Sequence, residues 1–219
     1  MPRAVTIAAF ALVLVAAGCG GSSSSGGSTE ATGGCKDVSA PAARDDGGGT
    51  APTERLDPER TWTLAFDTSC GTFVVTLDLD SAPATAASLV SLAKAGYYDD
   101  TIFHRIVPGF VIQGGDPTAS GTGGPGYSTR DRVPRNAAYT PGVVAMAKAG
   151  NEPPGTAGSQ FFVVTAAGTG LTPDYALLGR VTKGMDVVRE IGKLGDPASG
   201  GAGTPLQSVV IEKATVNER

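Results

Sequence analysis

From about residue 61 onward, the chain consists of short runs in which apolar residues alternate with polar or small ones. Trp62, Leu64 and Phe66 form the first run, and Phe73 opens a second run after a turn-forming Asp-Thr-Ser-Cys-Gly stretch. A period of two is typical of strands that bury one face. The region 61–80 is therefore predicted to be a β-hairpin. Further strand-like runs lie at 105–113, 142–147, 160–165, 176–181 and 208–216.

Helical periodicity is confined to two stretches that are far apart in the chain. Pro83 suits the first turn of a helix, and Gly96 is placed to end it. The apolar residues between them follow the spacing of one helix face: Ala86, Leu89, Val90 and Ala93. The second stretch runs from about Met185 to Leu194. Because repeated strand–helix–strand units are missing, the pattern favours a mainly β fold, a closed antiparallel barrel, over an α/β sheet.

The N-terminal residues are typical of a targeting signal. Arg3 precedes the apolar run Ala4–Ala17, which has about the length of a signal peptide core and is too short for a comfortable membrane span. Small residues before Cys19 resemble the bacterial lipobox, although Ala16 stands where leucine is commoner. We therefore expect a lipoprotein signal peptide at 1–18 and a lipidated Cys19 that anchors the exported protein to the bacterial cell envelope. An ordinary secretory signal is the alternative.

The segment that follows the signal, and the two other cysteines, also fit an exported protein. Residues 19–60 lack a sustained apolar period and are rich in Gly, Ser and Pro, so they are predicted to form a flexible stalk before a folded domain at 61–219. If Cys19 carries lipid, two cysteines remain, Cys35 and Cys70. In an exported protein they most simply form a disulfide, and two free, partly buried thiols are the alternative.

Charge and histidine content exclude some classes of function. The net charge is −4, and no dense basic block occurs, so nucleic acid is not expected as a partner. With one histidine and three cysteines, a zinc site made by the protein alone would need almost all of them in one place. We expect no metal. The glycine-rich stretch Gly121–Gly126 is not expected to bind phosphate, because Pro125 and a polar loop follow it where a helix would be needed.

Four ordered segments carry a family resemblance. The stretch from Phe103 to Asp116 resembles the characteristic segment of the cyclophilin-type peptidyl-prolyl isomerases. The family's further segments are matched, in the right order, by 121–124, 146–150 and 158–162. The similarity covers about 61–216. It implies an eight-stranded antiparallel β-barrel with a helix at each end, a packed interior and a substrate groove on the outer face.

The resemblance also implies an activity and its residues. The reaction would be cis–trans isomerisation of Xaa–Pro bonds without a cofactor, on proline-containing peptides and unfolded client proteins outside the cytoplasm, and we expect a monomer. Arg105 would donate to the prolyl nitrogen as that bond twists, whereas a plain surface arginine is the alternative. The implied catalytic residues are Arg105, Phe110 and Gln113. The implied substrate-binding residues are His104, Val111, Ala147, Lys148, Ala149, Gln160, Phe162, Leu171 and Tyr175.

Three positions depart from the pattern of the family. Asparagine is usual where this chain has Lys148, which predicts unchanged backbone contacts but an altered preference for substrate charge. Many animal members have tryptophan in place of Gly170 and histidine in place of Tyr175, so cyclosporin should bind weakly. His104 is expected to have a structural role, since isomerisation moves no proton. A chaperone or a proline-binding module on the same fold is the alternative to an enzyme, and an envelope structural lipoprotein has less support.

Overall fold

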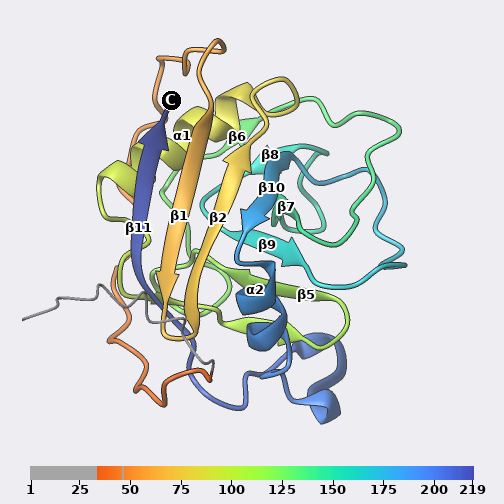
Figure 1. Cartoon of the computed structure of the whole chain (residues 1–219). Coiled ribbons are helices and arrows are strands. Elements are labelled where there is room, and N and C mark those ends of the chain that lie inside the picture. Colours follow the sequence, from red (N-terminus) through yellow and green to blue (C-terminus); the bar gives the residue numbers. More distant parts are fainter. Residues whose placement is uncertain (1–33, 46) are drawn as a thin grey trace, which may run out of the picture. The chain divides into compact units, whose positions relative to one another are not determined.

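The computed structural model describes residues 34–45 and 47–219, so the predicted signal peptide and Cys19 lie outside the described residues. Most of the described chain belongs to one large antiparallel sheet of nine strands, which curls around the core in Figure 1. Its strands, in spatial order, are β3 (Thr101–Ile102), β11 (Val210–Glu218), β1 (Trp62–Thr68), β2 (Gly71–Leu77), β10 (Leu177–Lys183), β7 (Val143–Met146), β9 (Phe161–Val164), β5 (Val111–Gly114) and β4 (Arg105–Val107). A separate pair consists of β6 (Thr129–Arg130) and β8 (Thr156–Ala157).

The mainly β prediction is confirmed, but a closed eight-stranded barrel is not. Strands β3 and β4 lie at the two ends of the large sheet, and no ladder joins them in the described part of the chain. One reason for the different strand count is that the predicted strand 105–113 is a hairpin. Pro108 has no N–H for a ladder, and Gly109 has a φ of +70°, so a turn separates β4 from β5.

Both predicted helices are confirmed. Helix α1 (Pro83–Lys94) packs against β11 and β6, whereas α2 (Met185–Gly192) packs against β2, β4 and β5, toward the other end of the sheet (Figure 1). The N-terminus of α1 has no capping side chain of its own. Instead, the Asp131 carboxylate accepts hydrogen bonds from the N–H groups of Ala84 and Thr85. A short 3-10 helix, η1 (Pro197–Ala202), follows α2. Among the described residues, no helix has the length and apolar character needed to cross a membrane.

Aromatic residues fill the inner side of the curled sheet. Phe66 stacks on Phe73 with ring centroids 5.2 Å apart, and Phe161 lies 5.0 Å from Phe66. Successive side chains of a strand point to opposite faces. The residue after Phe161 therefore lies on the outer face, where Phe162 packs with Val111 in a second, smaller apolar cluster. Because the interior is filled by side chains, a ligand site of this sheet lies on the outer face.

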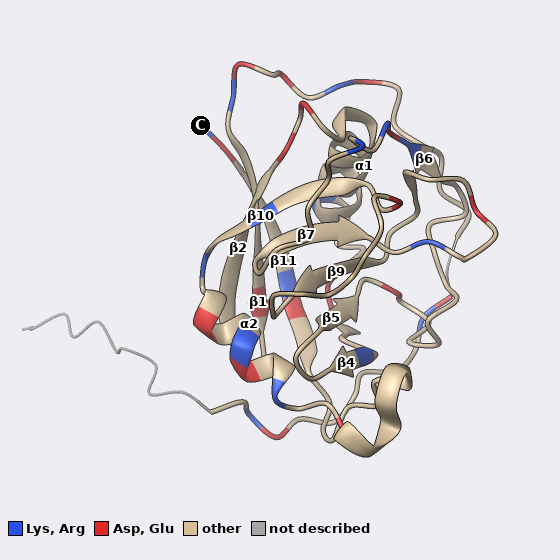
Figure 2. Ribbon diagram, turned by 90° about the vertical axis from the view of Figure 1, so that its right-hand side faces the viewer, with Lys and Arg blue, Asp and Glu red and all other residues tan. Residues whose placement is uncertain are grey.

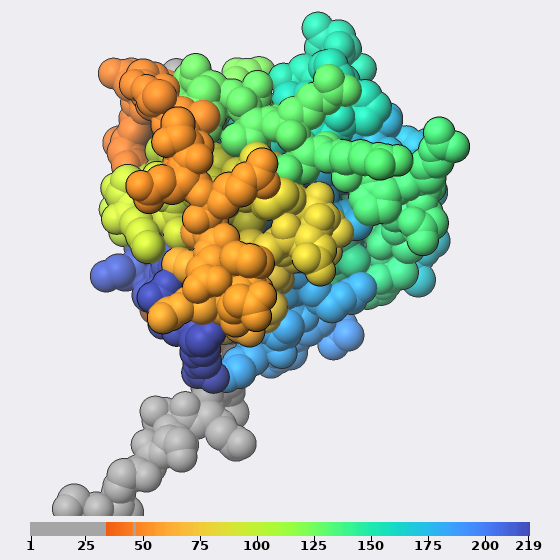
Figure 3. All heavy atoms as spheres, turned by 90° about the horizontal axis from the view of Figure 1, so that it is seen from above, coloured from red at the N-terminus to blue at the C-terminus, as the bar shows by residue number. Residues whose placement is uncertain are grey.

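Residues 34–60 follow the surface of the domain, in orange in Figure 3, and the described ones form no helix or strand. The Arg44 guanidinium donates to the carbonyls of Tyr97 and Asp99 at 2.8 and 2.7 Å. Further along, the N–H of Gly49 donates to the carbonyl of Pro125 at 2.9 Å. The part of the predicted stalk that the structure describes is thus attached to the domain, beside the glycine-rich loop.

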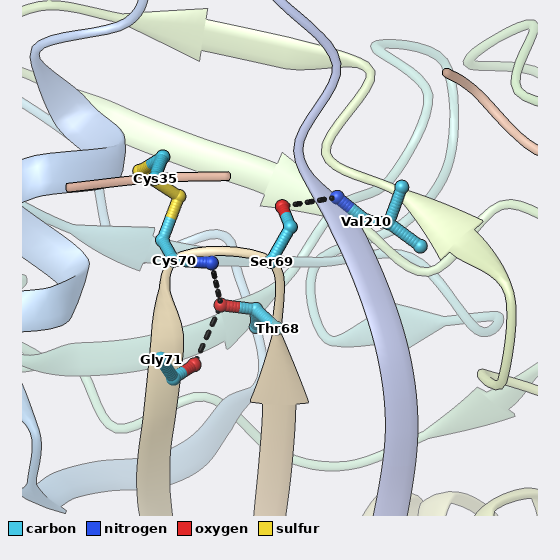
Figure 4. Close-up of a disulfide and its surroundings, with 6 residues drawn as sticks. All are labelled: Cys35, Thr68, Ser69, Cys70, Gly71 and Val210. Carbon is cyan, nitrogen blue, oxygen red and sulfur yellow. Dashed lines mark hydrogen bonds between the residues drawn. A yellow bond between two sulfur atoms is a disulfide. The ribbon is translucent and has the colours of Figure 1, made fainter. Parts of the chain in front are cut away.

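A disulfide joins Cys35 to Cys70 at the start of this segment (Figure 4). Cys70 lies in the turn between β1 and β2, where its N–H donates to the Thr68 hydroxyl at 3.1 Å. The N–H of Lys36 donates to the carbonyl of Ser69 at 2.9 Å. The bridge therefore fixes the beginning of segment 34–60 to the turn of the first hairpin.

Candidate active site

Three neighbouring strands, β4, β5 and β9, present the candidate site on the outer face of the sheet. Antiparallel pairing places Arg105 opposite Gln113, and Gln113 opposite Phe162. Because side chains alternate along a strand, Ile106 and Ile112 point into the core instead. One row of outward side chains therefore crosses all three strands.

A pocket of about 170 Å³ opens over this row, and we refer to it as the strand pocket. It is lined by nine residues that the sequence predicts for the site: Arg105, Phe110, Val111, Gln113, Ala147, Lys148, Phe162, Leu171 and Tyr175. Two other predicted residues, Ala149 and Gln160, line a neighbouring pocket, and His104 lines neither of the two. The strand pairing thus brings segments that are far apart in the sequence to one place.

Neutral acceptors hold the Arg105 guanidinium at the edge of the strand pocket. Its Nε and Nη2 donate to the Gly201 carbonyl at 3.1 and 2.9 Å, and its Nη1 donates to Oε1 of Gln113 at 3.3 Å. Its Cζ lies 5.9 Å from the centroid of the Phe110 ring. Burial lowers the pKa of Arg105 and Tyr175 raises it, but arginine stays protonated in proteins. A positive donor of fixed orientation therefore borders an apolar wall.

Two amide side chains extend this polar row. Nε2 of Gln113 donates to Oε1 of Gln160 at 3.0 Å, and Nε2 of Gln160 donates to the Gly123 carbonyl at 2.9 Å. Arg105, Gln113 and Gln160 therefore form one connected series of hydrogen bonds. The series leads from the strand pocket toward the glycine-rich loop.

Tyr139, which sequence reasoning did not identify, supports the aromatic wall of the strand pocket. Its hydroxyl donates to the Tyr175 carbonyl at 2.7 Å and accepts from the Tyr175 N–H at 2.9 Å. The Tyr175 ring then meets Phe162 edge to face, with centroids 5.3 Å apart. No local pattern could reveal this support, because 36 residues separate the two tyrosines.

The second pocket, of about 620 Å³, is called the loop pocket here. It shares Gln113, Ala147 and Lys148 with the strand pocket, and the glycine-rich loop 121–128 forms much of the rest of its lining. The loop therefore borders the groove that contains both pockets. The loop leads to β6 and not to a helix N-terminus, which is the arrangement that a phosphate loop requires.

A buried carboxylate, Asp116, holds the loop in place. It accepts hydrogen bonds from the N–H groups of Thr118, Gly121 and Gly123 and from the Thr118 hydroxyl. Burial raises the pKa of Asp116, but these hydrogen bonds together hold it below its ordinary value. Gly123 packs so closely on the carboxylate that a Cβ there would collide with it.

His104 takes a packing position behind the loop. Neither of its buried ring nitrogens has a hydrogen-bond partner in the described part of the chain, and the ring lies near Gly121. Burial lowers the pKa of His104, Asp116 raises it, and Arg105 lowers it further. The imidazole is therefore neutral at neutral pH. It lines neither of the two pockets, although the family resemblance implied a substrate contact. The described residues hold no cluster of three or more His, Cys, Asp or Glu side chains suited to a metal ion.

Fold and site together define a class of protein whose groove is suited to hold a ligand without bonding to it covalently. The strand pocket offers apolar walls for one ring-sized group and a charged donor at its edge, and no nucleophile in its lining is paired with a base. The loop pocket continues the groove along the same polar row. Such a site can hold a ligand against the apolar walls while the charged donor stabilises negative charge or a lone pair on it.

Comparison with known proteins gives the family. The family model described as "Cyclophilin type peptidyl-prolyl cis-trans isomerase/CLD" matches residues 63–216. A "Peptidyl-prolyl cis-trans isomerase-like 1" from Aspergillus oryzae is 40% identical over 159 residues, which cover 71% of this chain and 95% of the relative. A peptidyl-prolyl cis-trans isomerase from Arabidopsis thaliana is 38% identical over 135 residues, 60% of this chain and 80% of the relative. The chain therefore belongs to the cyclophilin-type peptidyl-prolyl cis-trans isomerases.

Solved structures agree with this assignment. The crystal structure of a cyclophilin-type peptidyl-prolyl cis-trans isomerase from Cryptosporidium parvum has a TM-score of 0.65 and 28% sequence identity, covering 72% of this chain and 98% of that one. A second crystal structure of that protein, in the presence of the dipeptide Ala-Pro, has a TM-score of 0.64 and covers 71% of this chain.

Proposed function

We propose that this isomerase holds the ring of a substrate proline in the strand pocket and uses Arg105 to stabilise the twisted Xaa–Pro bond. The single observation that carries the proposal is the lining of that pocket, where Arg105 and Gln113 border Phe110 and Phe162. The Ala-Pro dipeptide in a related structure supports a proline-containing ligand.

The proposed catalysis follows from the electronic structure of the amide. Rotation about the bond has a barrier of roughly 18–20 kcal/mol, because nitrogen shares its lone pair with the carbonyl. Twisting localises that pair on the prolyl nitrogen, where a guanidinium N–H can donate to it. Such a contact is stronger in the twisted state than in either planar isomer, so it lowers the barrier. The Gly201 carbonyl and Gln113 orient Arg105 before the substrate arrives.

The remaining predicted residues have binding roles in this proposal. Phe110, Phe162 and Leu171 surround the proline ring and exclude water, which would favour the planar, polar amide. Along segment 147–149, the N–H of Ala147 donates to the Gln160 carbonyl and the N–H of Ala149 to the Glu152 carboxylate. The backbone of Lys148, between them, is therefore the group that we assign to the substrate main chain before proline.

A protease-coupled isomerisation assay on an Xaa–Pro peptide tests the catalytic proposal. We expect the purified chain to accelerate isomerisation in proportion to its concentration. If it produced no acceleration but suppressed aggregation of unfolded clients, the non-catalytic chaperone or proline-binding module would replace this proposal. Phe110→Ala is a useful companion variant, because loss of a pocket wall should weaken peptide binding and turnover together.

We also propose that the protein is exported and lipid-anchored at Cys19, where it assists the folding of envelope or secreted proteins. The apolar run 4–17 and the small residues before Cys19 support this proposal, and the Cys35–Cys70 disulfide is of a kind found mainly in oxidising compartments. The mature protein should partition into detergent and carry a lipid mass on its first residue, and Cys19→Ser should release it. Cleavage elsewhere, with Cys19 unmodified, would contradict the anchor.

A further inference from the structure

The charges around the strand pocket are of one sign. Arg105 and Lys148 line it, and no aspartate or glutamate does. The ion pairs between described residues involve Lys36, Arg60 and Lys193, and neither Arg105 nor Lys148 takes part in one. Charged residues of both signs are otherwise interspersed along the ribbon in Figure 2. This cationic lining is thus a local feature of a chain whose net charge is −4.

Lys148 lies at the boundary between the two pockets and lines both of them. Its Nζ donates to the backbone carbonyls of Ala149 and Glu152, at 3.3 and 3.0 Å, and lies 5.8 Å from the centroid of the Tyr175 ring. These neutral acceptors hold the ammonium in place without cancelling its charge. An ammonium has three N–H donors, so two such bonds leave one proton for a further acceptor.

Glu152 is the one acidic residue in the linings of the two pockets, and it belongs to the loop pocket. Its carboxylate accepts from the N–H of Ala149 at 2.6 Å. The carboxylate is thus directed at the backbone, while Nζ of Lys148 contacts the backbone carbonyl of the same residue. Its negative charge weakens the field of Lys148 without forming an ion pair with it.

We propose that Lys148 makes this isomerase select segments with an acidic side chain on the residue directly before proline. The inference rests on the proposed function, in which the proline ring occupies the strand pocket and the residues before proline lie along the backbone of Lys148. Because Lys148 lines both pockets, we place those residues toward the loop pocket. A glutamate or aspartate there places its carboxylate beside the ammonium, which has no carboxylate partner of its own. An asparagine at this position would offer no such charge.

The test is a set of peptides Ala-Xaa-Pro-Phe in which Xaa is Glu, Gln, Ala or Lys. Exchange spectroscopy by NMR gives kcat/KM for each peptide without a coupling protease that has preferences of its own. We expect kcat/KM to be about 1.5- to fivefold higher for Glu than for Gln, the range for a partly exposed ion pair. The Lys peptide should be the poorest of the four, and added salt should reduce all of these differences.

Two variants should change the ratio of kcat/KM for the Glu peptide to kcat/KM for the Gln peptide, in opposite directions. Lys148→Asn should bring it close to one, and Glu152→Gln should raise it, because the amide still accepts from the Ala149 N–H while the competing negative charge is gone. Lys183→Asn is the matched control: Lys183 is an exposed lysine on β10 that lines neither pocket, so its loss should leave the ratio unchanged.

A ratio of one in the unmodified protein, or a ratio that Lys148→Asn does not alter, would overturn the inference. If none of the four peptides were turned over, the proposed function would fail instead. In that case the dissociation constants of the four peptides, measured by titration, would decide whether the acidic preference exists in binding.

Discussion

The strand pocket and the loop pocket share Gln113, Ala147 and Lys148, but the surrounding structure holds the two pockets in different ways. The strand pocket is based on β4, β5 and β9, whose ladder hydrogen bonds fix the direction of each outward side chain. The loop pocket is lined largely by residues 121–128, which contain no helix or strand.

Contacts from outside the loop hold it in place, as ladder hydrogen bonds hold a strand. The buried Asp116 carboxylate holds one side of it. On the other side, Gly49 donates to Pro125, and Gly126 packs against Gly47 and Gly48 so closely that a Cβ at Gly126 would lie 2.6 Å from the Gly48 nitrogen. The difference shows how one groove can hold Arg105, the proposed catalytic donor, on a sheet and leave the neighbouring pocket to a loop.

Removing the disulfide should have the largest effect on stability, and it should loosen the loop pocket more than the strand pocket. The double variant Cys35→Ser with Cys70→Ser should lose roughly 3–4 kcal/mol of unfolding free energy, because the bridge no longer restricts the unfolded chain. Hydrogen exchange should accelerate more in loop 121–126 than in strand β5, since the beginning of segment 34–60 then loses its covalent link to the first hairpin. Equal midpoints in denaturant for the double variant and the oxidised parent would contradict this expectation.

Arg105→Ala tests the strand pocket. Loss of a hydrogen bond from a charged donor of about 1.5–3 kcal/mol should lower kcat by about ten- to 150-fold, while peptide affinity falls much less. Arg105→Lys should restore only part of the rate, because an ammonium lacks the planar fork that contacts both Gly201 and Gln113. The protease-coupled assay measures the rate and a titration measures affinity. Near-normal turnover in a folded Arg105→Ala protein would refute the mechanism.

Asp116→Asn should loosen the loop pocket and change the pH dependence of stability. We expect a loss of about 1–3 kcal/mol at pH 7, because an amide cannot accept all the hydrogen bonds that the carboxylate accepts. The pKa of Asp116 is lower in the folded state than its ordinary value of 3.8, so its contribution is fully present above that pH and is lost as the pH falls below it. Denaturant titrations at several pH values should therefore show a weaker decline in acid for Asp116→Asn than for the parent. Parallel curves would show that Asp116 does not hold the loop through its charge.

Gly170→Trp, next to Leu171 of the strand pocket, should have the smallest net effect. An added indole should tighten cyclosporin binding, which is expected to be weak in the parent, since it restores an apolar wall and an N–H donor. A Cβ at Gly170 would meet open space, but the φ of +66° strains any side chain there, so part of the gain is offset. We expect a net gain of about 1 kcal/mol in a calorimetric titration. Tight binding by the unmodified protein would show that the missing indole is unimportant.

The local elements of this fold could be predicted from the sequence. Alternation between apolar and polar residues placed the hairpin 61–80, strand-like runs placed the strands predicted at 142–147, 160–165 and 208–216, and the three- and four-residue spacing placed both helices. Local backbone geometry suffices for these assignments, because strand and helix periods act over neighbouring residues.

Contacts between distant segments were decided only by the tertiary structure. The Gly201 carbonyl reaches Arg105 from 96 residues away, Asp131 caps helix α1 across 46 residues, and Tyr139 supports Tyr175 across 36. Gly49 meets the loop pocket in a segment whose composition indicates only a stalk. A hydrogen bond of this kind leaves no periodic trace in the sequence, since it depends on where two separately formed elements meet in space. Periodicity in the sequence therefore determined the local elements, and the family resemblance indicated the residues of the groove, whereas packing between remote segments determined how each part of the groove is held.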